Sequence, residues 1–324
     1  MKRREFIGVV AGAAAWPLAA RAQQAAMPTI GFLHAGSPEP NVNLVAAFRK
    51  GLAKTGHVEG QNVAIEFRWA AEHDDRLPEL AADLVRRRVV VIAAPGTTQA
   101  ALAAKAATAA IPIVFSTGGD PVALGLVASF NHPGGNVTGI VNTSAGLAAK
   151  RLGLLRQLAP QATHFAVLVT RDGPLTSTTL KDLQAPQLEL HVDVLYASNP
   201  GEIDTAIAKL AKNGRAALMV GPDAFLTNQR KQIVALTAQY ALPAVYSVRE
   251  FAEVGGLMSY GPNFVNTYEQ VGVYTGSILK GTKPAELPVE QSTQFELVIN
   301  VKTAKALGLP VSDQLVALAD ELVE

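Results

Sequence analysis

The sequence predicts an α/β protein of two similar lobes, each with a parallel sheet that carries helices on both faces. From Thr29 onward, short apolar runs alternate with amphipathic stretches, a pattern typical of parallel strands linked by covering helices. The same order of elements repeats in the second half of the 324-residue chain. A single sheet of about ten strands is unusual, whereas two sheets of about five are common. The repeat therefore favours two lobes.

The first half of the chain contains five apolar runs of strand length. They are residues 29–33, 63–69, 89–94, 111–115 and 136–141. Apolar residues at helical spacing lie between these runs and predict the linking helices. We expect a helix from Leu44 to Leu52 that ends at Gly56, one that starts at Asp74, and an alanine-rich one over 97–109.

The second half repeats this order. Its strand candidates are residues 164–169, 190–196, 216–220, 243–246 and 256–260. The helices expected between or before them cover 144–159, 201–212 and 223–240. Each strand is again followed by a helix, so the second lobe is expected to repeat the architecture of the first.

Residues 1–22 have the features of an export signal. A basic start (Lys2, Arg3, Arg4) precedes an apolar stretch to about Ala20, and Ala20-Arg21-Ala22 forms an A-x-A cleavage site. Arg3-Arg4-Glu5-Phe6-Ile7 resembles the twin-arginine signal, and the general secretory route is the alternative. An uncleaved anchor is disfavoured because the apolar run is shorter than the roughly 20 residues that a membrane span needs. We therefore expect a periplasmic protein.

Composition excludes several other classes. The chain has no cysteine, which excludes disulfides, thiolate metal sites and a lipid-anchored N-terminal cysteine. Removal of residues 1–22 takes four basic and one acidic residue from totals of 28 and 27, which leaves 24 and 26 and a net charge of −2. Nothing in this balance indicates binding to nucleic acid or to an anionic membrane.

Polar loops follow most of the expected strands. These loops cover residues 34–40, 95–100, 116–121, 170–174, 221–225 and 246–250. In the loop 116–121, Ser116, Thr117 and Asp120 precede Pro121, which suits the first turn of a helix, so Asp120 as a plain N-cap is the simplest interpretation. Ligands of open parallel sheets bind outside the carboxyl ends of the strands. Loops from two facing lobes are therefore expected to form a ligand cradle between them.

No catalytic or metal-binding motif appears in the sequence. The six histidines are scattered, and neither H-x-x-x-H, G-x-S-x-G, a P-loop nor G-x-G-x-x-G occurs. His34 alone lies on a predicted rim loop, where a polar contact is a more common role than catalysis. We expect no enzyme activity, no cofactor and no metal.

Four segments resemble a known family. They are "IGFLHAGSPEPNVNLVAAFRKGLAKTGHVEGQNVAIEFRWA" (30–70), "IPIVFSTGGDPVALGLVASFNHPGGNVTG" (111–139), "FAEVGGLMSYG" (251–261) and "FELVINVKTAKALGL" (295–309). They resemble the substrate-binding proteins of ABC importers, in the family that contains tryptophan- and tyrosine-binding members. This resemblance implies the type I periplasmic binding protein fold, in which several strands join two lobes as a hinge. It also implies that the chain crosses between lobes, with 27–141 plus 262–290 in lobe 1 and 142–261 plus 291–324 in lobe 2.

The resemblance further implies reversible capture of a small molecule by hinge closure, followed by docking of a monomer to a membrane permease. Amino-acid receptors of this fold bind the ligand carboxylate with loops after the third and fourth strands, which places Thr97, Thr98, Ser116 and Thr117 at that group. An acid in a second-lobe loop often binds the ammonium, and Asp223 occupies that position; a helix N-cap is its alternative role. An aromatic or branched amino acid is the ligand that the family favours.

Five further residues are weaker candidates for side-wall contacts. They are His34, Ser37, Asp120, Arg171 and Tyr246. Arg171 has a solvated surface charge as its alternative, and the segment 171–190, which is short and contains Pro186, departs from the longer helix usual in the family. Two other functions stay open: a periplasmic sensor partner of the same fold, and an exported α/β enzyme. A repressor is disfavoured because no helix-turn-helix precedes Thr29.

Overall fold

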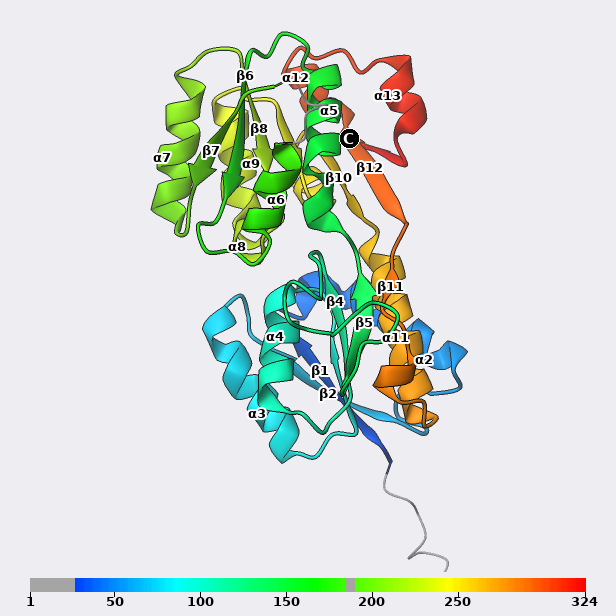
Figure 1. Cartoon of the computed structure of the whole chain (residues 1–324). Helices are drawn as coiled ribbons and strands as arrows, with labels where there is room; N and C mark the ends of the chain where they lie inside the picture. The colour runs from blue at the N-terminus through cyan, green and yellow to red at the C-terminus, as the bar shows by residue number, and fades with distance from the viewer. Residues whose placement is uncertain (1–26, 185–189) are drawn as a thin grey trace, which may run out of the picture.

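The computed structural model describes residues 27–184 and 190–324. The expected export signal and Pro186 lie outside these residues. The described chain forms two α/β lobes, one above the other in Figure 1, and three segments pass between them. The predicted fold class is confirmed.

The first sheet has six strands, all parallel, in the order β11-β5-β4-β3-β1-β2. These strands are β1 (Thr29–His34), β2 (Ala64–Trp69), β3 (Val91–Ala94), β4 (Ile113–Thr117), β5 (Val137–Val141) and β11 (Glu290–Gln291). The first five match the predicted apolar runs to within three residues at either end. The two-residue β11 had no counterpart in the prediction, because so short a strand leaves no periodic pattern.

Helices cover both faces of this sheet, as predicted. The two faces carry α3 (Leu77–Arg86) with α4 (Thr98–Ala107), and α2 (Val42–Lys54) with α11 (Phe264–Leu279). Strand side chains alternate between the two cores: Phe32 points to the α2–α11 side and Leu33 to the α3–α4 side. The short 3₁₀ helices η1 (Glu39–Asn41), η2 (Asp74–Arg76) and η5 (Pro284–Glu286) lie in the connections.

The pair α2 and α11 packs through glycines. A Cβ atom on Gly51 would clash with the carbonyl oxygen of Glu269, and one on Gly272 would clash with the carbonyl oxygen of Phe48. Absence of both side chains lets the two backbones approach closely. A helix from the last quarter of the chain is thus fixed against one of the first.

The second sheet has seven strands in the order β13-β12-β10-β9-β8-β6-β7, and its β10–β12 pair is antiparallel. The strands are β6 (His164–Val169), β7 (Val192–Tyr196), β8 (Ala216–Val220), β9 (Ala244–Tyr246), β10 (Met258–Pro262), β12 (Phe295–Asn300) and β13 (Glu321–Val323). The strands β6 to β10 match the apolar runs predicted for the second half of the chain. The antiparallel pair arises because the chain returns from the first lobe along β12.

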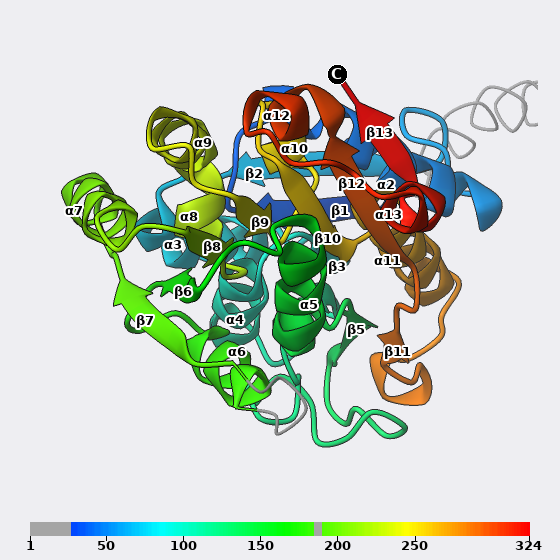
Figure 2. The same ribbon diagram turned by 90° about the horizontal axis from the view of Figure 1, so that it is seen from above.

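Helices again cover both faces, and Figure 2 shows α7 and α9 on one side of the sheet and α5 on the other. The helices and the 3₁₀ helix of this lobe are η3 (Ser144–Leu147), α5 (Ala148–Leu158), α6 (Thr176–Leu183), α7 (Pro200–Ala211), α8 (Ala224–Asn228), α9 (Arg230–Gln239), α10 (Glu250–Glu253), α12 (Val301–Ala306) and α13 (Asp313–Leu318). The single helix expected over 223–240 is wrong, because the helical hydrogen bonding is interrupted at Gln229.

The helix expected after the loop 116–121 is also absent. Residues 121–126 form only a turn, in which the N–H groups of Leu124 and Leu126 bond to the carbonyls of Asp120 and Pro121. Gly125 adopts φ +70, the left-handed conformation that commonly ends a helix. The turn therefore stops before a second turn can form.

The three passages between the lobes join β5 to η3, β10 to α11, and β11 to β12 (Figure 1). Hydrogen bonds tie them to one another. The N–H of Ser292 donates to the carbonyl of Val141 over 2.8 Å, and the N–H of Asn263 donates to the carbonyl of Gln294 over 3.0 Å. The passages thus form one connected hinge region beside the interlobe space.

Candidate functional site

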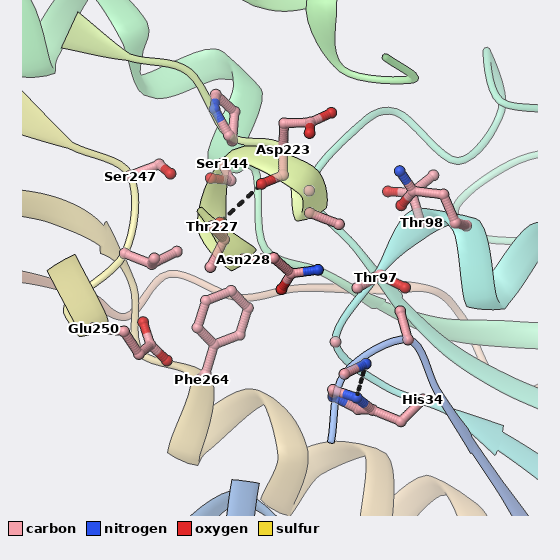
Figure 3. Close-up of a pocket in the computed structure, with 18 of the residues that line it drawn as sticks. His34, Thr97, Thr98, Ser144, Asp223, Thr227, Asn228, Ser247, Glu250 and Phe264 are labelled. Atoms are coloured by element: carbon pink, nitrogen blue, oxygen red, sulfur yellow. Dashed lines mark hydrogen bonds between the residues drawn. The ribbon is translucent and has the colours of Figure 1, made fainter. Parts of the chain in front are cut away.

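A pocket of about 1100 Å³, including its open mouth, lies between the lobes. Both lobes contribute side chains to it (Figure 3). It lies at the carboxyl ends of β1, β3 and β4 in one lobe and of β6, β8 and β9 in the other, which is where ligands of parallel sheets bind. The structure therefore brings most of the predicted rim loops to one place.

The loop before α4 forms part of the first-lobe wall. Thr97 is the N-cap of α4, since its Oγ1 accepts a hydrogen bond from the N–H of Ala100 over 3.2 Å. Gly96 adopts φ +99, and a Cβ atom there would clash with the hydroxyl of Tyr268. Glycine at this position allows the backbone to pack closely against Tyr268 and His34. Thr97 and Thr98 both line the pocket, as the sequence predicts.

Ser116 and Thr117 lie one layer behind that wall. Ser116 is fully buried, and its Oγ accepts a hydrogen bond from the N–H of Gly96 over 2.9 Å. The hydroxyl of Thr117 lies 2.8 Å from that of Thr98. Neither residue lines the pocket. Ser116 and Thr117 therefore support Gly96 and Thr98, which line the pocket, instead of forming the wall as expected.

His34 and Tyr268 form a buried pair in the same wall. Nδ1 of His34 accepts the N–H of Gly36 over 2.9 Å, so the ring hydrogen lies on Nε2, which donates to the hydroxyl of Tyr268 over 2.7 Å. Burial lowers the pKa of His34 to about 4, which keeps the ring neutral. The hydroxyl hydrogen of Tyr268 is then free to bond elsewhere. His34, Ser37 and Tyr268 line the pocket.

Asp223 lies on the second-lobe wall with both of its carboxylate oxygens engaged. Oδ1 accepts a hydrogen bond from the N–H of Leu226 over 3.2 Å, which makes Asp223 the N-cap of α8. Oδ2 accepts one from the hydroxyl of Thr170 over 2.8 Å. Figure 3 also shows the bond from the hydroxyl of Thr227 to the Asp223 carbonyl, 2.8 Å long. Asp223 therefore lines the pocket and caps its helix at once.

Glu250 was not among the predicted site residues. It is the first residue of α10, lines the pocket, and has a buried Oε2 atom without a hydrogen-bond partner in the part of the chain that the structure describes. Burial raises the pKa of its carboxyl, and the positive charge of Arg230 lowers it less strongly. The loop 246–250 was predicted to reach the rim, and Tyr246, at its other end, was the residue predicted to contact the ligand. Position at the end of a polar rim loop was the signal for Glu250.

Two further polar atoms of the pocket lining have no partner within residues 27–184 and 190–324. They are Oδ1 of Asn142 and Oγ of Ser247, both on buried side chains. Buried polar groups in native proteins are nearly always hydrogen-bonded. Three such groups around one pocket indicate a site built to bond to a polar molecule. Leu44, Leu175, Val248 and Phe264 supply the apolar part of the lining, and the Phe264 ring points into the cavity in Figure 3.

Besides Ser116 and Thr117, three predicted residues, Asp120, Arg171 and Tyr246, lie away from the pocket lining. Asp120 is exposed, and its Oδ1 accepts hydrogen bonds from the N–H groups of Val122 and Ala123, as its N-cap alternative implies. The guanidinium of Arg171 lies over the ring of Tyr196, 4.6 Å from its centroid.

Tyr246 belongs to the hydrophobic core of the second lobe. Its ring stacks on Phe251 with 4.4 Å between centroids, and its hydroxyl lies 3.0 Å from that of Thr237. Burial raises the pKa of this hydroxyl. In β9 every residue is buried, so a rim position and a core position look alike in the sequence.

Among the described residues, no group of three or more His, Cys, Asp or Glu side chains could hold a metal ion. Within the same residues, no helix is both long and apolar enough to cross a membrane.

Comparison with known proteins agrees with this architecture. The sequence profile described as ABC transporter substrate binding protein matches residues 39–323. The chain is 28% identical over 266 residues to a tyrosine-binding protein of Clostridioides difficile (strain R20291), which covers 81% of this chain and 75% of that protein.

Two solved structures share the fold. A conserved domain protein from Vibrio cholerae has a TM-score of 0.84 and 21% identity, and the ABC domain from Streptococcus pneumonia in complex with L-Trp has a TM-score of 0.83 and 24% identity. Both matches cover 91% of this chain and 99% of the other. With a family profile that spans nearly all the described residues, the chain belongs to the ABC transporter substrate-binding protein family.

Proposed function

We propose that this protein is the exported receptor of an ABC importer, which captures an amino acid between its lobes and presents it to a membrane permease. Its family membership supports the general role. A curated relative is named as a tyrosine-binding protein, and a structural neighbour is a complex with L-Trp. These names favour an amino acid, with an aromatic side chain as the first choice.

The observation that carries the proposal is the Oε2 atom of Glu250, which is buried and has no hydrogen-bond partner within the described residues. Glu250 is one of the residues that line the pocket. A buried charge without a partner costs several kcal/mol, so a group that supplies a positive charge there is strongly favoured. The α-ammonium of an amino acid provides that charge and three donors. Glu250 therefore replaces Asp223 as our first choice for this contact, because both oxygens of Asp223 are already engaged.

The first-lobe wall suits the other end of the ligand. Thr97 and Thr98 lie at the start of the ten-residue helix α4, where the helix dipole favours a negative charge. Tyr268 can donate its hydroxyl hydrogen nearby. Phe264 and Leu44 offer apolar contacts between the two polar walls, as an aromatic or branched side chain requires. A ligand that touches both lobes stabilises the closed arrangement over an open one.

The first test is a binding screen of residues 23–324 by thermal shift and calorimetry. The panel contains the amino acids, organic acids, sugars and nucleosides, and it includes L-tryptophan with indole-3-propionate, its analogue without the ammonium group. A ligand at about 100 times its dissociation constant stabilises the protein by about 2.7 kcal/mol. We expect stabilisation by amino acids and none by indole-3-propionate. Equal binding of both compounds would contradict the ammonium site, and silence of all amino acids would contradict the proposed ligand class.

Three variants assign the contact. Glu250→Gln is expected to lower amino-acid affinity by about a hundredfold, because a lost buried charge partner costs 2–5 kcal/mol or more. Glu253→Gln, on the same short helix but exposed, is the matched control and is expected to bind as the wild type does. Asp223→Asn is expected to have a smaller effect, which arises from the weakened cap of α8. A reversed order would return the role to Asp223.

A further inference from the structure

Arg151 is a fully buried arginine at the hinge. It lies on α5, with none of its side chain exposed. Its Nε donates to the carbonyl of Tyr260 over 2.6 Å, Nη1 to the carbonyl of Ser144 over 2.8 Å, and Nη2 to Oγ of Ser144 over 3.2 Å. None of these bonds, in the part of the chain that is described, goes to a carboxylate. Burial lowers the pKa of Arg151 to about 9, and the more distant charge of Asp182 raises it.

The acceptors of Arg151 flank two different passages between the lobes. Ser144 begins η3, directly after the passage from β5, and Tyr260 lies in β10, just before the passage into α11. One guanidinium thus joins two of the three segments. Gln291, at the third passage, donates from Nε2 to Oγ1 of Thr143 over 3.1 Å and completes the set.

Desolvation of a buried guanidinium costs several kcal/mol, and the three hydrogen bonds of Arg151 include no ion pair that would offset this cost. Its planar fork, however, fixes the directions of its donors, which the single ammonium group of lysine does not. The carbonyls of Ser144 and Tyr260 must keep one relative position for all three bonds to survive. Arg151 therefore restrains how the two passages can move past each other.

The hydrogen bonds of Arg151 also position a residue of the pocket lining. Ser144 lines the pocket, and its Oγ accepts a hydrogen bond from Arg151. The hydroxyl hydrogen of Ser144 is thus free to donate to a ligand. The next N–H along, that of Ala145, donates to the carbonyl of Gly118 on the first lobe over 3.1 Å, and Gly118 also lines the pocket. One side chain is connected in this way to the hinge and to the pocket.

We infer that Arg151 is a positioning residue that fixes the pivot of lobe closure and orients Ser144 toward the ligand. It holds the first two passages at one distance, so the lobes rotate about a defined axis. Loss of the guanidinium frees the passages, and the folded protein then samples a wider range of lobe orientations. This inference rests on the proposed capture of a ligand between the lobes.

The test measures lobe orientation directly in the folded protein. Because the chain contains no cysteine, Val122→Cys and Val194→Cys place one spin label on each lobe, at side chains that are 42% and 39% exposed. The distance distribution between the labels is recorded with and without L-tryptophan. Arg151→Lys is expected to broaden the distribution of the ligand-free protein and to weaken L-tryptophan binding by about tenfold, the loss of roughly one charge-assisted hydrogen bond. Arg156→Lys, exposed on the same helix, is the control.

A purely structural role predicts a different result. In that case Arg151→Lys lowers the melting temperature but leaves the distance distribution of the folded protein unchanged, which would overturn the inference. Should Arg151→Lys not fold, Ser144→Ala removes one of the three bonds without affecting the charge; a smaller broadening is expected, and an unchanged distribution would likewise overturn it. If the wild type does not bind L-tryptophan, the proposed ligand fails, while the ligand-free distances still decide the role of Arg151.

Discussion

The hydroxyl of Tyr268 lies 2.7 Å from Nε2 of His34, although 234 positions separate the two residues in the chain. The bond requires a neutral imidazole with its hydrogen on Nε2, since Nδ1 accepts the N–H of Gly36. It therefore connects β1 to α11 and turns the tyrosine hydroxyl into a donor at the pocket. Because burial lowers the pKa of His34 to about 4, the ring stays neutral at neutral pH and is protonated only in acid. The stability of the protein should therefore depend on pH through this residue.

The first prediction concerns this response. Burial lowers the pKa of His34 from 6.5 to about 4, so the unfolded chain binds a proton between these values while the folded protein does not. The free energy of unfolding should thus fall by about 3 kcal/mol as pH falls from 6.5 to 4 because of this group, and not above or below that window. Urea denaturation of the wild type and His34→Gln at several pH values measures the difference. Parallel pH curves for the two proteins would contradict it.

Gly96→Ala is expected to impair the pocket more than the fold. Gly96 adopts φ +99, and an added Cβ atom would clash with Tyr268 and approach Nε2 of His34 to 2.7 Å. Gly281→Ala is the matched control, because Gly281 adopts φ +101 with no atom within 4 Å of an added Cβ. Both variants should lose about 1–2 kcal/mol through backbone strain, and Gly96→Ala alone should also lose amino-acid binding in calorimetry. Equal binding by the two variants would show that the space beside Gly96 is not needed.

Ser116→Ala is expected to destabilise the first-lobe wall. The substitution leaves the N–H of the half-buried Gly96 without the acceptor that it has now, and an unsatisfied donor costs up to about 1–3 kcal/mol. Ser292→Ala provides the comparison: Ser292 is also buried, but its Oγ has no partner in the described residues. Its substitution should change the unfolding free energy by about 0.5 kcal/mol or less. Chemical denaturation of both variants checks the difference.

Asp74→Asn is expected to strengthen ligand binding. Burial and the negative charges of Asp223 and Asp75 raise the pKa of Asp74. Because Asp223 belongs to the opposite lobe, two like charges face each other across the interlobe space, and closure has to overcome their repulsion. Removal of one charge of such a partly exposed pair contributes up to about 1 kcal/mol, or about fivefold in affinity.

The gain should shrink as pH falls, because Asp74 of the wild type then becomes neutral by itself. Asp75→Asn, exposed and on the same turn, is the control for a general change in net charge. A gain of the same size in both variants would point to net charge in place of the contact with Asp223.

Most elements of the fold could be predicted from the periodicity of apolar residues in the sequence. Strand runs such as 29–33 and 164–169 are apolar throughout because both faces of a parallel sheet are buried, and this makes them easy to recognise. The elements that were missed are short: β11 has two residues and α10 has four, too few for a period to appear. The loop after β4 was mistaken for a helix start because Asp120-Pro121 is a good cap, whereas Gly125 ends the turn.

The site was harder to predict for a related reason. Rim loops identify the region where a ligand binds, and Thr97, Thr98 and Asp223 do line the pocket. Which residue of a loop faces inward depends on how the loop folds on its neighbours. Ser116 points inward and accepts a hydrogen bond from Gly96, and Tyr246 lies in the hydrophobic core. Glu250 lines the pocket from α10, which is too short to give a recognisable pattern in the sequence. The link from Arg151 to Ser144 and Tyr260 is entirely tertiary.

The contact between α2 and α11 has a consequence for how the chain folds during synthesis. Phe48 and Gly51 pack against a partner helix that begins only at Phe264, after five of the seven strands of the other lobe have been made. The first lobe thus depends on contacts of very high sequence separation, which slow folding because a long loop must close before they form. A nascent chain that stops before Phe264 leaves the face of α2 around Gly51 uncovered. The lobe whose synthesis starts first is therefore completed only after five strands of the other lobe have been made.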